Sequence, residues 1–171
     1  FRKTSLFNWS LASTSASKLS HTLPDYWRGS ANLGSRIITS SANWRKDSRG
    51  FDKFEWVRDL RAFGGSQARS RARQLIESWI DSNKNWRVGS WQPDIMGQRV
   101  ANLVFCYDWY ASSAPEDFQA KLACVIARQA HCLALDWPRL YDQTAQLTAL
   151  KGLFVGQSAL CAKPDDLDAL L

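Results

Sequence analysis

Several signatures of common enzymes and metal proteins are missing from this chain of 171 residues. It contains no G-x-S-x-G, H-E-x-x-H, P-loop or G-x-G-x-x-G sequence, the motifs that mark many nucleophilic, zinc-dependent and nucleotide-binding sites. Only two histidines are present, His21 and His131, and none of the four cysteines forms a C-x-x-C pair. We therefore predict no catalytic residue, no metal site and no cofactor within this chain.

Long apolar runs are missing as well. No stretch approaches the roughly 20 residues that span a bilayer, so no membrane span is expected. The opening "FRKTSLFNWSLASTSASKLS" has basic residues but no continuous apolar segment, unlike a signal peptide. The chain lacks an initial Met, and its end, "KPDDLDALL", reads as the start of a helix. We expect it to be a piece of a longer polypeptide.

The composition nevertheless favours a packed domain with an anionic partner. Hydrophobic residues make up 45% of the chain and charged residues 22%, which is enough for a core. Nine tryptophans suit helix interfaces and also stacking on sugars. The net charge of +6 favours nucleic acid, acidic polysaccharide or an anionic membrane surface. A solvated basic surface without such a partner is the alternative.

Two regions are expected from the residue patterns. Residues 1–49 are Ser-rich and predict an irregular arm with a short extended piece at "SRIITS", anchored by Trp9, Trp27 and Trp44. Residues 50–171 predict five helices joined by short loops, which makes sequence neighbours antiparallel. The expected fold class is therefore all-α, an array of antiparallel helical hairpins behind an irregular arm.

The boundaries of these helices are marked by glycine, proline and capping residues. A first helix over 51–63 should stop at Gly64-Gly65, and a second should start from Ser66 as N-cap. Pro93-Asp94 opens a third helix that runs to Tyr110. Ser113 and Glu116 form an S-x-x-E capping box for a fourth, which ends at Trp137-Pro138. The fifth helix covers residues 139–161.

Helical periodicity predicts which side chains are buried. In the fifth helix, Gly152 and Gly156 lie one turn apart and would let a neighbouring helix approach closely. His131 falls opposite the apolar face of the fourth helix and should be solvated. The predicted inward residues are Ala68, Ala72, Leu75, Ile76 and Trp79 in the second helix, Phe118, Leu122, Val125, Ile126 and Leu133 in the fourth, and Leu140, Leu147, Leu150 and Phe154 in the fifth.

Two arginines fall on packing faces. Arg99 lies inside the apolar arc of the third helix, and Arg61 lies between Phe54 and Val57 of the first. An unpaired buried charge is very costly, so each guanidinium needs carboxylates or carbonyls. The candidate partners are Asp59, Asp94 and Glu77.

The sequence leaves two interpretations of these arginines open. Either they tie helices and loops together, or they line a cleft and bind the carboxylates or sulfates of a substrate through their bidentate geometry. Trp91 could stack on a sugar ring in the same cleft, or it could pin a loop onto the core. The candidate substrate-binding residues are therefore Arg61, Trp91 and Arg99.

Three spaced segments resemble a known family: "FEWVRDLRAFGGSQARSRARQLIESWI", "WQPDIMGQRVANLV" and "PRLYDQTAQLTALKGLFVGQSAL". Over about residues 20–161 the chain resembles the N-terminal helical region of heparinase II/III-like proteins, especially a bacterial branch with a Trp-Arg-Pro-Asp motif. That motif here reads Trp91-Gln92-Pro93-Asp94, so Gln92 departs from it. Arg99 matches the arginine that follows, and Leu103 stands where many relatives carry a tryptophan.

This resemblance implies a fold and an activity. It implies an (α/α) toroid followed by a β-sandwich, which together cleave uronic-acid polysaccharides by β-elimination. The expected partners are an anionic polysaccharide and the missing C-terminal helices and sandwich of the same polypeptide. The family's catalytic asparagine, histidine and tyrosine lie in those later parts, so none is carried over to this chain. The compartment is left open between the periplasm and the cytoplasm of a bacterium.

A second hypothesis is a non-catalytic helical scaffold that binds protein or nucleic acid through a basic face. Arg69, Arg71 and Arg73 in "ARSRARQ" are the candidates for contacts with phosphates. These three residues are spread around their helix and do not form one stripe, so nucleic acid is not the expected partner.

Overall fold

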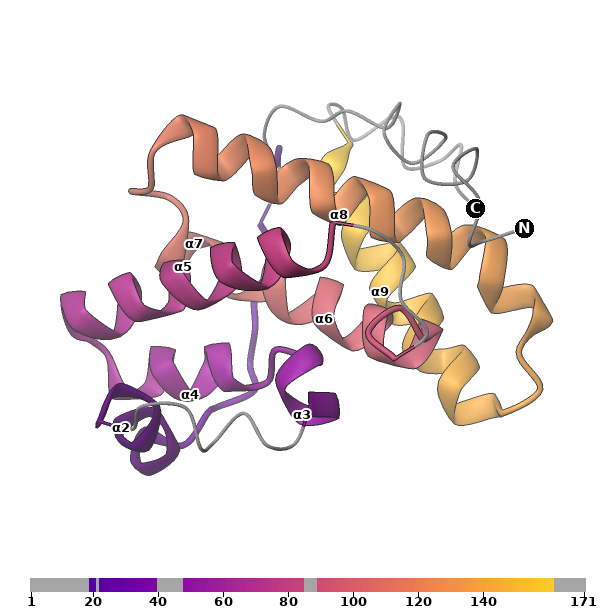
Figure 1. Cartoon of the computed structure of the whole chain (residues 1–171). Helices are drawn as coiled ribbons and strands as arrows, with labels where there is room; N and C mark the ends of the chain where they lie inside the picture. The colour runs from indigo at the N-terminus through magenta and orange to yellow at the C-terminus, as the bar shows by residue number, and fades with distance from the viewer. Residues whose placement is uncertain (1–18, 21, 40–47, 85–88, 162–171) are drawn as a thin grey trace.

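The computed structural model describes residues 19–20, 22–39, 48–84 and 89–161 (Figure 1). Within these ranges the chain is all-α and contains no strand, which confirms the predicted class. The helices are α2 (Ala31–Thr39), α3 (Ser48–Asp52), α4 (Trp56–Phe63), α5 (Gly65–Ser82), α6 (Pro93–Phe105), α7 (Tyr107–Tyr110), α8 (Glu116–Asp136) and α9 (Gln143–Leu160), with a 3-10 turn, η2 (Trp137–Arg139), before α9.

Helices α4, α6 and α9 run in the same direction. Gly97 of α6 packs against the backbone of Thr148, and Val100, one turn later, packs against Gly156, so α6 and α9 advance together. Arg99 bonds to Asp52, just before α4, while Arg61 near the end of α4 bonds to Phe105 at the end of α6. These three helices form the first of two layers.

The second layer consists of α5 and α8, which lie side by side and also run together (Figure 1). Lys121 pairs with Glu77, and Arg128, two turns later, bonds to the carbonyl of Lys84. The tight turn between α4 and α5 and the η2 turn between α8 and α9 reverse the chain. Each short connection therefore joins antiparallel neighbours from different layers.

The predicted arm contains a helix. Residues 35–39, expected to be extended, belong to α2, whose Gly34 and Ile37 are buried. Gly34 lies against the backbone of Asp59, where a Cβ atom would come within 2.3 Å of the carbonyl oxygen, so packing on α4 decides the conformation. Trp27 is 75% exposed and does not anchor the arm. Trp9 and Trp44 lie outside the described residues, and the arm boundary stays a prediction.

The helix predicted over 51–63 is broken in two at Phe54. This residue has a φ of 62°, the left-handed region that side chains other than glycine rarely adopt. Its ring is completely buried and packs at 5.1 Å from Trp56 and 5.3 Å from Trp79, between ring centroids. The turn directs the carbonyls of Asp52 and Lys53 to α6, where Arg99 and Asn102 donate hydrogen bonds to them.

The helix ends predicted from glycine and proline are confirmed, whereas the predicted N-terminal caps are wrong. Gly64 ends α4, and Trp137-Pro138 follows the end of α8, as expected. Ser66 does not cap α5, which begins at Gly65 without a side-chain cap. The capping box at Ser113 is also wrong, because its hydroxyl accepts a hydrogen bond from Arg73 instead. The third helix ends at Phe105 and is continued by the separate α7.

The predicted inward faces of α5 and α8 are confirmed, with Val125 only half-buried. The face predicted for α9 is wrong at Leu147 and Phe154, which are 68% and 58% exposed, while Leu140 and Leu150 are half-buried. Helix α9 turns its small residues inward because its backbone meets that of α6. A Cβ atom on Gly152 would lie 2.3 Å from the Cα of Gly97, so the predicted close approach is confirmed.

Candidate functional site

Arg99 is completely buried at the centre of the molecule. Its Nε donates to Oε1 of Gln129 at 2.9 Å, and its Nη1 and Nη2 donate to the carbonyls of Asp52 and Ser90, each at 2.8 Å. The guanidinium also lies over the Trp79 ring, 4.3 Å from the centroid. The predicted carboxylate partners are wrong for this residue: among the described residues, no carboxylate lies within ion-pair distance of Arg99.

The charge of Arg99 is therefore held by neutral oxygens and an aromatic face. Burial lowers the pKa of Arg99 from 12.5 to about 9, while the charge of Asp52 acts in the opposite direction. The guanidinium still carries its proton at neutral pH, which leaves a cation in the core. Asp52 is fixed separately, because its Oδ1 accepts a hydrogen bond from Nε1 of Trp79 at 2.7 Å.

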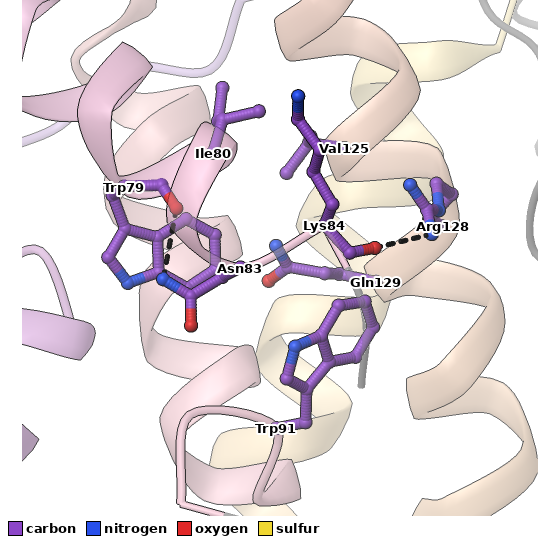
Figure 2. A pocket seen from close by; sticks show the side chains of 8 residues that line it. All are labelled: Trp79, Ile80, Asn83, Lys84, Trp91, Val125, Arg128 and Gln129. Carbon is purple, nitrogen blue, oxygen red and sulfur yellow. Dashed lines mark hydrogen bonds between the residues drawn. The ribbon is translucent and has the colours of Figure 1, made fainter. Parts of the chain in front are cut away.

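A small pocket opens beside this cation, between α5 and α8 (Figure 2). Trp91 lines one side of it and is only 3% exposed, so its ring has no open face on which a sugar could stack. The nitrogen edge of the indole is turned away from Arg128, on the side where Asn83 lies (Figure 2). The side chains around the pocket are Trp79, Ile80, Asn83, Lys84, Trp91, Val125, Arg128 and Gln129.

Arg61 belongs to a second cluster, built around Asp25. Its Nη2 donates to Oδ2 of Asp25 at 2.7 Å and to the carbonyl of Trp27 at 3.0 Å. Arg58 donates to the same carboxylate at 2.9 Å. The Arg61 side chain is 25% exposed, and the segment to which it bonds carries Tyr26 and Trp27, which are 88% and 75% exposed. This cluster combines an accessible cation with exposed aromatic rings.

The Asp25 carboxylate is shielded from solvent. Burial alone would raise its pKa, but hydrogen bonds from Arg58 and from the backbone of Trp27, together with the charges of Arg58 and Arg61, outweigh that effect. The pKa of Asp25 is therefore held below its usual value. The carboxylate stays ionised and fixes Arg58, Arg61 and the Trp27 backbone in one arrangement.

The structure brings two of the three predicted site residues together and separates the third. Arg99 and Trp91 meet around Ser90 and Gln129, whereas the Arg61 cluster shares no hydrogen-bond partner with them among the described residues. Gln129 was missed, although it falls on the apolar stripe of α8 between Ile126 and Leu133. Its place on that stripe is the signal that could have revealed it.

Asp25 was also missed, because no periodic pattern marks a carboxylate in an irregular segment. Two of the three predicted partners of Arg61 are occupied elsewhere. Asp59 accepts from the backbone of Ser30, and Glu77 pairs with Lys121. Pairing between residues 36 positions apart depends on the packing of the arm against α4, which the local sequence does not encode.

The three arginines of the basic segment on α5 do not form a free basic face. Arg73 donates to the carbonyl of Tyr110 at 2.6 Å and to Ser113, which ties α5 to the α7–α8 turn. Burial and the charge of Arg69 lower the pKa of Arg73. Arg71 donates to Gln74 on its own helix. One of the three candidate phosphate contacts is thus committed to holding the fold.

Within the part of the chain that the structure describes, the remaining reactive side chains gather into no further site. His131 is exposed, as predicted, and His21 lies outside the described residues. Burial raises the pKa of the Cys106 thiol to about 11, so it stays protonated at neutral pH. In the described part of the chain, no group of three histidine, cysteine or acidic residues could hold a metal, and no helix is long and apolar enough to cross a bilayer.

Comparison of the chain with protein-family models, with curated proteins and with solved structures found no match.

Proposed function

We propose that this chain is the N-terminal helical part of a heparinase II/III-like polysaccharide lyase and supplies one wall of a groove for acidic polysaccharide. The observation that carries the proposal is the direction of the helices. An (α/α) toroid requires an inner layer that runs one way and an outer layer that runs the other way. The arrangement of α4, α6 and α9 against α5 and α8 has this alternation.

Within this proposal the arginines have different roles. Arg61 is partly exposed and bonds to the backbone of Trp27, whose ring is exposed, so Arg61 can contact a uronate carboxylate while Trp27 stacks on a neighbouring sugar. Arg99 is completely buried and cannot touch a polymer, so it acts by fixing α3, α6 and α8. The proposal assigns no catalytic residue to this chain, because the acid and base of β-elimination belong to later segments.

The proposal is tested by titrating the 171-residue chain with alginate and heparin, and with dextran as the neutral control. We expect binding to the acidic polymers only, which weakens when the salt is raised from about 50 to about 300 mM because exposed charges are screened. The Arg61→Gln variant should bind about threefold more weakly. Arg71→Gln is the matched control, because it removes an arginine of α5 outside the Asp25 cluster.

Three results would contradict the proposal. They are equal binding to dextran and alginate, tighter binding to duplex DNA than to either acidic polymer, and release of unsaturated uronate by this chain alone, seen as rising ultraviolet absorbance. Tighter DNA binding would favour the basic helical scaffold. Arg73 argues against that scaffold, because it is already bound to Tyr110 and Ser113.

A further inference from the structure

The pocket between α5 and α8 displays hydrogen-bond donors that have no acceptor. The indole Nε1 of Trp91 is buried and donates to no atom, and the Nε of Arg128 is in the same situation. A buried donor without a partner destabilises the folded state, and native structures rarely keep several in one place. Both side chains line the same pocket, with the indole nitrogen on the side away from Arg128, and this indicates that a bound group accepts from them.

Gln129 adds a third donor whose orientation is fixed. Arg99 can only donate, so the atom of Gln129 that faces its Nε must be the amide oxygen. The amide nitrogen is therefore left for the pocket, and it donates to no described residue. Gln129 is 1% exposed and Trp91 is 3% exposed, so neither side chain can turn away into solvent.

The side-chain oxygens around the pocket already accept one hydrogen bond each. Oε1 of Gln129 accepts from Arg99, and Oδ1 of Asn83 accepts from the hydroxyl of Ser90. A water molecule in the pocket would need acceptors for its own two hydrogens, and among these side chains only the second lone pair of each oxygen is left for them. A ligand that only accepts hydrogen bonds meets this requirement better.

The charge around the pocket favours an anion. Arg99 lies directly behind Gln129 without a carboxylate at ion-pair distance, and Arg128 contributes a second positive charge. Lys84 is less important, because it pairs with Asp81 at 3.3 Å and its ammonium points away from Trp91 (Figure 2). A negative ligand would add to the partial compensation that the charge of Asp52 gives this buried cation.

We propose that this pocket binds a carboxylate, held by the indole N–H of Trp91 and the amide N–H of Gln129, with the Arg128 guanidinium beside it. An ionised carboxylate only accepts, and its two oxygens offer about four lone-pair directions for these donors. The space admits a group of a few atoms but no whole sugar ring. The carboxylate therefore belongs either to a small free acid or to a uronic acid that inserts only this group.

Indole N–H resonances in proton–nitrogen correlation spectra test this proposal on the 171-residue chain. We titrate with sodium acetate at constant ionic strength, using sodium chloride as the blank. The Trp91 resonance, identified by its loss in Trp91→Phe, should shift in a saturable way with a Kd on the order of millimolar. The indoles of Trp79 and Trp56 are internal controls, because they already donate to Asp52 and to the carbonyl of Phe51.

Variants separate binding from general perturbation. Trp91→Phe keeps the ring but loses the donor, so the Kd for acetate, now followed on the Gln129 amide, should rise about tenfold. Arg128→Lys removes the Nε donor without burying a new group, and it should raise the Kd about threefold. The matched control is Lys121→Gln, an exposed change on the same helix that should leave the Kd unchanged.

The source of the carboxylate is distinguished by a second titration with glucuronate, with glucose as its neutral control. Tighter binding of glucuronate than of acetate indicates a uronic acid, and equal or weaker binding indicates a small free acid. The proposal is overturned if neither ligand gives a saturable shift of the Trp91 resonance, or if chloride produces the same shift. It does not depend on the proposed function, because acetate can bind here even if no polysaccharide does.

Discussion

The two arginine clusters each hold a positive charge at a packing face, but they do so with different kinds of partner. At the centre, Arg99 is completely buried and is held by two carbonyls, one amide oxygen and an aromatic ring. At the edge, Arg61 stays partly exposed and shares a buried carboxylate with Arg58. The central cation has no ionic partner among the described residues, whereas the edge cluster contains one anion for two cations.

This difference separates a structural role from a binding role. Neutral oxygens hold a guanidinium in place without cancelling its charge, so the centre keeps a positive potential that can act on the adjacent pocket. A carboxylate cancels most of the charge but leaves the second arginine of the edge cluster in excess. Burial thus makes Arg99 a supporting residue, while exposure makes Arg61 available to a partner.

The largest expected effect comes from truncating Arg99 to alanine, with Arg61→Ala as its comparison. Arg99→Ala leaves a cavity and strips the carbonyls of Asp52 and Ser90 of their donor, so unfolding should become easier by about 4 kcal/mol. Arg61→Ala should cost only about 1 kcal/mol, because Arg58 still pairs with Asp25 and the side chain is partly exposed. Urea unfolding measures the free energy of unfolding of both variants. Equal losses in the two variants would contradict the different roles of Arg99 and Arg61.

A smaller effect is expected where the central helices touch. In Gly97→Ala the new Cβ atom would lie 2.2 Å from the carbonyl oxygen of Thr148, so α6 and α9 must separate. We expect a loss of about 3 kcal/mol, measured by the same unfolding experiment. Gly89→Ala is the control, because nothing lies within 4 Å of that position, and it should change stability by less than about 0.5 kcal/mol. If Gly97→Ala has the same free energy of unfolding as the wild type, the contact between α6 and α9 can widen without cost, and the prediction is wrong.

An effect smaller than those of Arg99→Ala and Gly97→Ala, and one that depends on pH, is expected for Asp25→Asn. Loss of the anion should cost about 2 kcal/mol at neutral pH. The folded pKa of Asp25 lies below its unfolded value of 3.8, so its stabilisation is complete above that value and disappears as the pH falls through the folded pKa. Unfolding measured from about pH 7 to pH 3 should show the gap between wild type and variant closing only in acid. A constant gap would contradict the role of the carboxylate.

Much of the helical pattern was predictable from the sequence, because strong local signals set it. Gly64 and Trp137-Pro138 end helices for backbone reasons that apply in any context. The stripe of α5 is buried as its period indicates. The face of α9 was wrong because period alone does not say which side meets a neighbour. Its glycines allow a backbone contact with α6, and Leu147 and Phe154 are left outside.

The candidate site was predictable only in part. The sequence placed Arg99 on a packing face and Trp91 beside the N-terminus of the same helix. It left carboxylates and carbonyls open as partners, and the carbonyl that the turn at Phe54 supplies could not be located, because no residue type reveals it. Asp25 could not be found, because its pairing with Arg61 depends on how the arm packs against α4.

The left-handed Phe54 has one more consequence. Backbone carbonyls inside a continuous helix are taken by amides four residues later, so a chain that stayed helical from Ser48 to Phe63 would have none to spare. The break in the helix at Phe54 frees the carbonyl oxygens of Asp52 and Lys53, which point toward α6. The binding site for the Arg99 guanidinium thus depends on the backbone conformation at Phe54. A substitution that made this turn helical would remove the acceptors without changing any residue that contacts Arg99.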